Sequence, residues 1–235
     1  MLTILREGDD SEKPAARWSP VYYALRDAIV SHRLAPGTKL PEDEIGSIYS
    51  VSRTVVRAAL QALAHDRLAR LEPNRGAFVA QPSKREAREV FEARALIEPK
   101  VAWLAAQSAV PDDIAQLRRH LEKEHAALDA GRDSEAIMLS ARFHVGIAEI
   151  AAHSIFTKLV RDLVSHSSLI IALYWRRRDT TCERHAHQAL VDAIEAGLSA
   201  EAADLMSSHL ADLLSGLDLS SAVRKSKSLA DLLLS

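Results

Sequence analysis

The sequence predicts a mainly α-helical protein built from two domains. The N-terminal domain is expected to contain three helices plus a β-hairpin, and the C-terminal domain an all-α antiparallel bundle of about six helices. Residues 20–82 combine short amphipathic stretches with turn formers and two short extended segments. From residue 83 to about residue 217 the chain is rich in Ala and Leu at helical spacing, with almost no strand signal. A length of 235 residues leaves room for both domains.

The composition excludes several classes of protein. The single cysteine, Cys182, rules out an internal disulfide framework. No apolar stretch approaches the roughly 20 residues that a membrane-spanning helix needs. Residues 1–17 lack the apolar core of a signal peptide and are expected to form a flexible arm, with residues 218–235 as a C-terminal tail. A cytoplasmic location without membrane association is therefore expected.

The first elements form a helix-turn-helix pattern. An apolar stripe with helical spacing ends near Ser31, and residues 34–37, Leu-Ala-Pro-Gly, then supply a turn. Residues 42–49 form a short helical segment with Ile45 and Ile48 inward, and residues 51–66 follow as a longer one. Two short helices joined by a few residues are typical of a helix-turn-helix.

The second of these helices has the features of a DNA-recognition helix. Ser52 is a preferred N-cap residue, and Arg53 and Thr54 lie in the first turn, where such helices present side chains to base edges. Arg57 follows Arg53 by four positions and shares its face. The opposite face is apolar, through Val56, Ala59, Leu60 and Leu63. An ordinary amphipathic helix with solvated arginines remains the alternative at this point.

A β-hairpin is predicted directly after this helix. Residues 68–71 and 77–79 are short extended candidates, and the turn formers of residues 72–76 separate them. The tip contains Arg75 and Gly76, a cation and a residue that lets the backbone approach a phosphate or the minor groove. A hairpin in this position is the wing of a winged helix-turn-helix, which gives a DNA-binding domain over residues 18–82.

Residues 20–82 closely resemble the winged helix-turn-helix of GntR-type bacterial transcription regulators. The family motif Val-Ser-Arg-Thr-Pro-Val-Arg-Glu-Ala-Leu stands here as VSRTVVRAAL, and its wing motif as NRGAFV. Val55 replaces the usual Pro and Ala58 a Glu, and both suit a helix interior. Asp43 stands where some relatives carry a phosphate-binding Arg, which removes a cation. The resemblance and the wing together indicate DNA contacts from Ser52, Arg53, Thr54, Arg57, Arg75 and Gly76.

Charge is distributed unevenly between the two domains. The formal net charge is −2, yet residues 18–82 carry eight Lys and Arg against six Asp and Glu. Because neutralised phosphates supply most non-specific affinity for DNA, one such mildly basic domain should bind weakly. A homodimer on a pseudo-palindromic operator in double-stranded DNA is therefore expected.

The second domain, residues 83–217, contains three candidate metal ligands. Ser83 and Glu86 form a capping box that opens its first helix. His144 lies on the third helix of the bundle, His187 starts the fifth and His209 lies late in the sixth. Imidazoles from different helices can converge on a divalent cation such as Zn or Ni, although a lone helical histidine is more often an ordinary core or surface residue.

Residues 84–215 resemble the FCD ligand-binding domain of the FadR branch of the GntR superfamily. The likeness rests on the segments 94–98 and 141–144 and on the two later histidines. It implies metal ligation by His144, His187 and His209, joined in many relatives by an Asp that is Ser140 here. It also implies a pocket for a small carboxylate. A three-histidine metal site completed by water or effector, and histidines that bind an anionic effector without metal, both stay open.

The expected effector contacts are Arg94, Ser140, His144, His187 and His209. A buried Arg94 could grip a carboxylate bidentately, whereas an exposed one would simply pair with Glu98 one turn away.

The resulting hypothesis is a metabolite-responsive DNA-binding transcription regulator, expected to be a repressor and not an enzyme. One alternative is a metal-dependent hydrolase with an open water position on three histidines. It lacks any recognisable general base or nucleophile motif. Another is an effector-independent DNA-binding protein whose pocket has decayed. The effector, the operator, the regulated genes, the metal and the sign of regulation are not encoded in recognisable form.

Overall fold

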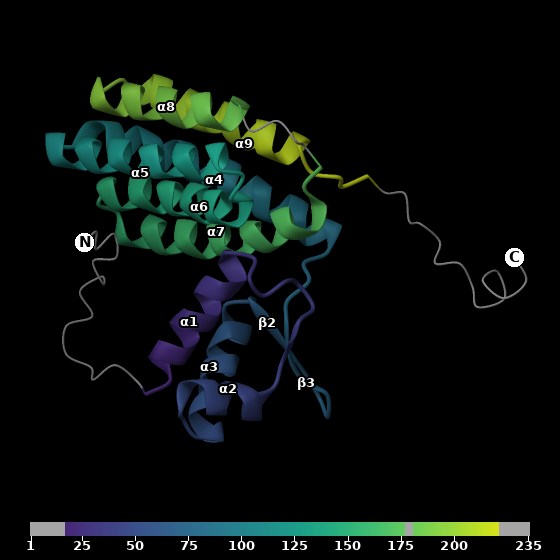
Figure 1. The fold of residues 1–235 in the computed structure, drawn as a ribbon. Helices are drawn as coiled ribbons and strands as arrows, with labels where there is room; N and C mark the ends of the chain where they lie inside the picture. Colours follow the sequence, from purple (N-terminus) through teal and green to yellow (C-terminus); the bar gives the residue numbers. More distant parts are fainter. Residues whose placement is uncertain (1–16, 177–180, 221–235) are drawn as a thin grey trace, which may run out of the picture.

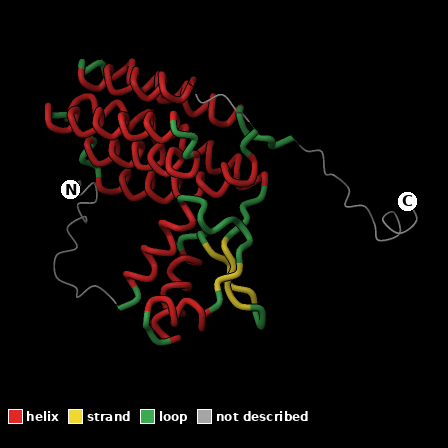
Figure 2. The backbone as a smooth tube through the Cα atoms, in the orientation of Figure 1, coloured by secondary structure: helices red, strands yellow, loops and turns green. Residues whose placement is uncertain are grey.

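The computed structural model describes residues 17–176 and 181–220, without the side chains of residues 181–184. The predicted arm and tail therefore lie almost entirely outside the described residues. Within these residues the protein is mainly helical, with a small three-stranded sheet in the N-terminal part and a helical bundle after it (Figures 1 and 2). The predicted fold class is confirmed.

The N-terminal part is a winged helix-turn-helix. Its elements are α1 (Ser19–Val30), β1 (Lys39–Leu40), α2 (Glu42–Tyr49), α3 (Arg53–His65), β2 (Ala69–Glu72) and β3 (Gly76–Val79). The sheet is antiparallel, with the strand order β1-β3-β2. Strand β1 was not predicted, because two residues carry no alternation that a sequence pattern could reveal. It fixes the segment before α2 against the wing.

The C-terminal part is a bundle of helices joined by short turns. Its helices are α4 (Lys84–Ser108), α5 (Pro111–Asp129), α6 (Asp133–Ile150), α7 (Ser154–Tyr174), α8 (Thr181–Glu195) and α9 (Ser199–Ser215). Helix α4 begins at the predicted capping box: the Glu86 amide donates to Ser83 Oγ over 3.2 Å, and the Ser83 amide donates to Glu86 Oε2 over 2.8 Å. Helix α7 lies next to the winged helix, whereas α8 and α9 lie on the far side of the bundle (Figure 1).

One buried residue of the bundle belongs to the core of the other domain. Leu169 of α7 is fully buried, and it packs in the cluster formed by α1, α3 and the wing rather than with the bundle's own core. Helix α1 contacts α7 directly. Burial of a leucine side chain contributes roughly 1.5–3 kcal/mol, so the two domains share part of their stabilisation.

Candidate functional site

Helix α3 presents the predicted DNA-contacting side chains to solvent. Ser52, Arg53, Thr54 and Arg57 are all exposed. The buried face is the predicted one and consists of Val56, Ala59, Leu60 and Leu63. Ser52 caps the helix, with its hydroxyl accepting from the Val55 amide at 3.5 Å. The local pattern therefore orients the polar face of α3 away from the core.

Both arginines of this face are paired with acidic residues of α2. Arg57 makes two contacts with Glu42: Nε to Oε1 at 3.1 Å and Nη2 to Oε2 at 2.7 Å. The hydrogen bond from Arg57 lowers the pKa of the Glu42 carboxyl, although desolvation partly opposes it. Arg53 Nε lies 2.5 Å from Asp43 Oδ1. These pairs were not predicted, since the partners are 10 and 15 positions apart and share no helix face.

The wing carries its cation and its glycine on the surface. Arg75 Nη1 lies 2.5 Å from Glu72 Oε2, and the Arg75 guanidinium carbon lies 5.6 Å from the centre of the Phe78 ring. Gly76 has φ +94°, and no atom lies within 4 Å of the position that a Cβ would take. Its requirement for glycine thus comes from the backbone angle rather than from crowding.

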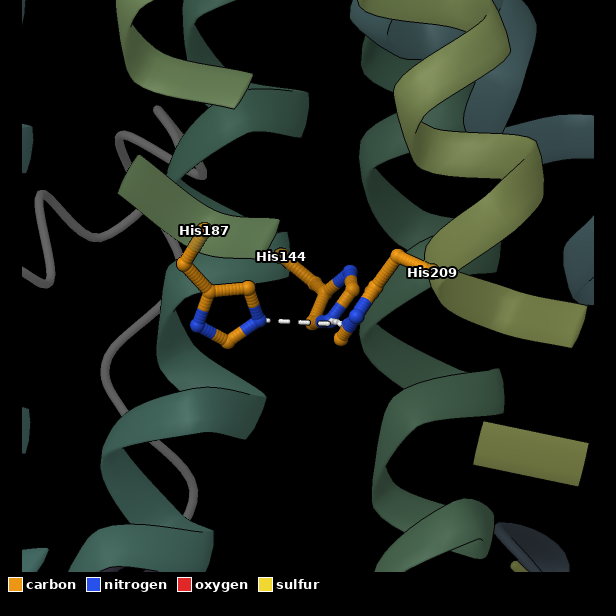
Figure 3. A group of neighbouring side chains, drawn as sticks. All are labelled: His144, His187 and His209. Carbon is orange, nitrogen blue, oxygen red and sulfur yellow. Dashed lines mark hydrogen bonds between the residues drawn. The ribbon is translucent and has the colours of Figure 1, made fainter. Parts of the chain in front are cut away.

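The three predicted histidines converge in the middle of the bundle (Figure 3). His144 of α6, His187 of α8 and His209 of α9 are all buried. His209 Nε2 lies 3.2 Å from Nε2 of His187 and 3.2 Å from Nε2 of His144. His187 lies in the second turn of α8 and not at its start, because the helix begins at Thr181. Sequence spacing alone could not establish this convergence.

Carboxylates contact Nδ1 of two of the three rings, whereas the Nε2 atoms face the other histidines. His144 Nδ1 lies 2.6 Å from Glu98 Oε2, and His187 Nδ1 lies 3.0 Å from Glu124 Oε1. A ring nitrogen this close to a carboxylate oxygen carries the proton, so the lone pair of each neutral ring is on Nε2. This carboxylate–imidazole arrangement is the one that orients histidine ligands toward a metal. Glu124 was missed, since nothing marks a residue that contacts His187 63 positions later.

Burial favours the neutral form of the His144 and His209 rings. Burial lowers the pKa of His209 well below its usual value, and the neighbouring His187 and His144 lower it further. Burial also lowers the pKa of His144, although Glu98 opposes the shift. Burial raises the pKa of Glu98, but the Arg94 guanidinium and the His144 ring outweigh it and bring that pKa to about 2. Glu98 is therefore ionised beside two donors.

The donor set fits a transition-metal ion. With Nδ1 protonated on His144 and His187, at most one proton is left for the three facing Nε2 atoms. One N–H cannot serve both 3.2 Å contacts, so at least one contact joins two lone pairs. Nitrogen ligands about 2.1 Å from a tetrahedral or octahedral metal lie about 3.0–3.4 Å from one another. Both 3.2 Å distances from His209 Nε2 to the other two Nε2 atoms fall in this range.

A cavity of about 430 Å³ opens beside the histidines. Its polar lining includes Arg94, Glu124, Ser140, His144, Ser167 and Ser168. Three of the five predicted effector contacts thus line it; His187 and His209 are absent from its described lining. Arg94 is buried, but its Nε lies 2.5 Å from Glu98 Oε1, so a ligand would meet a guanidinium that is already paired.

Two serines of α7 line this cavity, one of them also bonds to the winged helix, and sequence reasoning missed both. Ser167 and Ser168 line the cavity. The Ser168 hydroxyl also donates to the Val30 carbonyl at 3.3 Å, at the end of α1. Two residues earlier, His166 Nε2 donates to the Asp66 carbonyl at 2.6 Å. Small polar residues in the largely apolar second half of α7 were the available signal.

Comparison with known proteins matches both parts of the chain to families. Residues 19–79 match the bacterial regulatory proteins of the gntR family, and residues 89–212 match the FCD domain. The HTH-type transcriptional repressor RspR of Escherichia coli K12 is 33% identical over 131 residues, which are 56% of this chain and 58% of RspR. The Nta operon transcriptional regulator of Aminobacter aminovorans is 28% identical over 160 residues, 67% of this chain and 75% of that protein.

The whole described fold also recurs in solved structures. A GntR transcriptional regulator from Rhodococcus sp. RHA1 superimposes with a TM-score of 0.74 at 25% identity, over 85% of this chain and 96% of that one. The match to RspR spans less than two thirds of that relative. Among residues 17–176 and 181–220, no helix combines the length and the apolar character needed to cross a bilayer.

Proposed function

Because the chain belongs to the GntR family of bacterial regulatory proteins and contains an FCD domain, we propose that it is a metabolite-responsive repressor. In this proposal a homodimer binds a pseudo-palindromic operator in the cytoplasm, and a small carboxylate in the bundle releases it. The observation that carries the proposal is the exposed polar face of α3, which is backed by the buried apolar face of the same helix.

DNA binding is assigned to α3 and the wing. The first turn of α3 would enter the major groove with Arg53, Thr54 and Arg57, and Ser52 would contact the backbone beside it. The wing would approach with Arg75 and Gly76. Two copies are needed because acidic residues of the same domain neutralise most of the positive charge of α3 and the wing. A second copy doubles the number of phosphate contacts and so strengthens the electrostatic attraction to DNA.

The three-histidine centre is assigned to a divalent transition metal, with Zn and Ni as candidates. His144, His187 and His209 would hold it, Glu98 and Glu124 would orient two of the rings, and the ion would supply a Lewis acid beside the cavity. Ser140 lines the cavity one turn before His144, where its hydroxyl is a weaker ligand than a carboxylate. An effector carboxylate could take that place.

The effector would act by shifting the population of dimers that match the operator. The cavity assigned to the effector is lined by Ser168, whose hydroxyl also bonds to the Val30 carbonyl at the end of α1. The bound ligand and the winged helix would therefore contact the same turn of α7. Effector and operator would then oppose each other through one coupling free energy.

Two alternatives fit less well. A metal-dependent hydrolase has no support in the relatives, which are named as regulators. An effector-independent DNA-binding protein leaves the 430 Å³ cavity and its polar lining without a role. The cavity volume lies in the range of small-molecule sites.

The test is selection of a binding duplex from a random DNA library by the full-length protein, followed by titration with small carboxylates. Arg57→Ala should lose specific binding and keep the oligomeric state. His187→Ala should bind the effector-free duplex nearly normally and lose the response. A protein that enriches no duplex would refute the proposal.

A further inference from the structure

We propose that Glu42 positions Arg57 for reading a guanine and at the same time suppresses its attraction to phosphates. The inference rests on the proposed DNA binding and assigns a specificity role to an acidic residue that does not itself need to touch DNA. It starts from the two-point contact between the Glu42 carboxylate and the Arg57 guanidinium.

The contact leaves one edge of the guanidinium free. Glu42 accepts from Nε and Nη2 of Arg57, at 3.1 Å and 2.7 Å. A guanidinium has five N–H donors in a fixed plane, so Nη1 and the outer hydrogen of Nη2 remain. These two donors are parallel and match the two acceptors, O6 and N7, that guanine presents in the major groove. The carboxylate therefore occupies the edge that base reading does not need.

Glu42 is better anchored than its neighbour on the same helix. Its side chain is 31% exposed, against 67% for Asp43, whose pair with Arg53 joins two largely solvated groups. Glu42 also lies in the first turn of α2, where the helix dipole favours a negative charge. A long arginine side chain that is already held in one orientation loses less rotamer entropy when it binds.

The same carboxylate reduces the attraction of Arg57 to the DNA backbone. A guanidinium paired with a carboxylate contributes little net positive charge, and attraction to phosphates is a charge effect that carries no sequence information. Hydrogen bonding to a guanine edge depends on donor direction, which the pair preserves. Glu42 thus favours the operator mainly by weakening competing binding to other DNA.

The experiment compares Glu42→Gln with Glu44→Gln in the full-length protein. Glu44 is exposed on the same helix and takes part in no ion pair among the described residues, so its variant controls for the loss of one acidic charge. Affinities for the selected duplex and for a scrambled duplex are measured by fluorescence anisotropy at several salt concentrations. Circular dichroism confirms folding of each variant.

Glu42→Gln is expected to bind scrambled DNA more tightly than Glu44→Gln does. The salt slope for scrambled DNA should steepen by about 0.9 per subunit, the value of one additional neutralised phosphate. The ratio of operator to scrambled affinity should fall about tenfold per half-site, within the range of one arginine–guanine contact. When Arg57 is already replaced by Ala, Glu42→Gln should change the salt slope and the affinity ratio no more than Glu44→Gln does, because its partner is gone.

A base substitution locates the contact. Replacing the guanine of the selected half-site with 7-deazaguanine removes N7. This change should lower the operator affinity of the wild type by a larger factor than that of the Glu42→Gln variant. The role of Glu42 is refuted if Glu42→Gln and Glu44→Gln have the same affinity ratio and the same salt slope. If Arg57→Ala has at the same time lost specific binding to the operator, the DNA-binding assignment stands. If the wild type prefers no duplex, both fail.

Discussion

The His32 imidazole, just after the end of α1, donates from Nε2 to the backbone carbonyl of Ser168 over 2.8 Å, and this bond joins the two domains. Ser168 lines the cavity of the bundle, and the next residue, Leu169, packs in the core of the winged helix. One turn of α7 thus contacts the proposed ligand site on one side and the DNA-binding domain on the other. No intervening linker has to carry a signal between them.

Leu169→Ala is expected to destabilise the winged helix more than the bundle. Truncation of a fully buried leucine costs about 2–5 kcal/mol, and here the lost contacts are those of the N-terminal core. Limited proteolysis followed by mass spectrometry should show cleavage in residues 18–82 first. Leu190→Ala, buried in the bundle core, is the matched control and should expose the bundle instead. Equal cleavage patterns would contradict the shared core.

His32→Asn should loosen the contact between the domains without disturbing either core. Residue 32 has φ +57°, a conformation that Asn tolerates better than most residues, so the substitution removes the bond to Ser168 with little backbone strain. A loss of roughly 0.5–1.5 kcal/mol is expected. Hydrogen exchange should become faster at the end of α1 and stay unchanged in α3. Uniform acceleration through the domain would argue against a local contact.

Addition of Zn or Ni to metal-free protein should raise its melting temperature. At a free metal concentration of about 100 times the Kd, the stabilisation is about 2.7 kcal/mol, or roughly 5–10 °C for a protein of this size. His209→Ala should abolish the increase, because its Nε2 lies 3.2 Å from that of each of the other two histidines. His153→Ala alters a helix cap outside the cluster and should keep the increase. An equal increase in both variants would place the metal elsewhere.

Ser140→Asp is expected to tighten metal binding by at least about tenfold. Residue 140 precedes His144 by one helical turn and lines the same cavity, so a carboxylate there can reach the ion on the face it shares with the histidine. Competition with a chromophoric chelator measures the Kd. Ser167→Asp, which lines the same cavity from α7 rather than from α6, is the control and should not tighten binding. Unchanged affinity in Ser140→Asp would remove this position from the coordination sphere.

Much of the N-terminal domain was predictable because its signals are local. The N-cap at Ser52, the apolar stripe of α3 and the turn formers of the wing each depend on neighbours within a few positions. The glycine of the wing followed from a backbone angle that few other residues adopt. Strand β1 was missed, since a two-residue strand exists solely through its pairing with β3. The prediction that Ile48 points inward was wrong: its side chain is 65% exposed, and the short helix α2 buries Ile45 alone.

The sequence by itself determined the helices and the buried face of α3, because periodicity and capping act over a single turn. It marked the histidines as candidate ligands through their place on separate helices and through the family resemblance. The tertiary structure decided that those histidines meet, that Glu98 and Glu124 hold two of them, and that acids of α2 hold the arginines of α3. It also placed Leu169 in the core of the other domain. Such contacts join residues from 10 to more than 100 positions apart, and their distances depend on how whole helices pack rather than on any neighbouring residue.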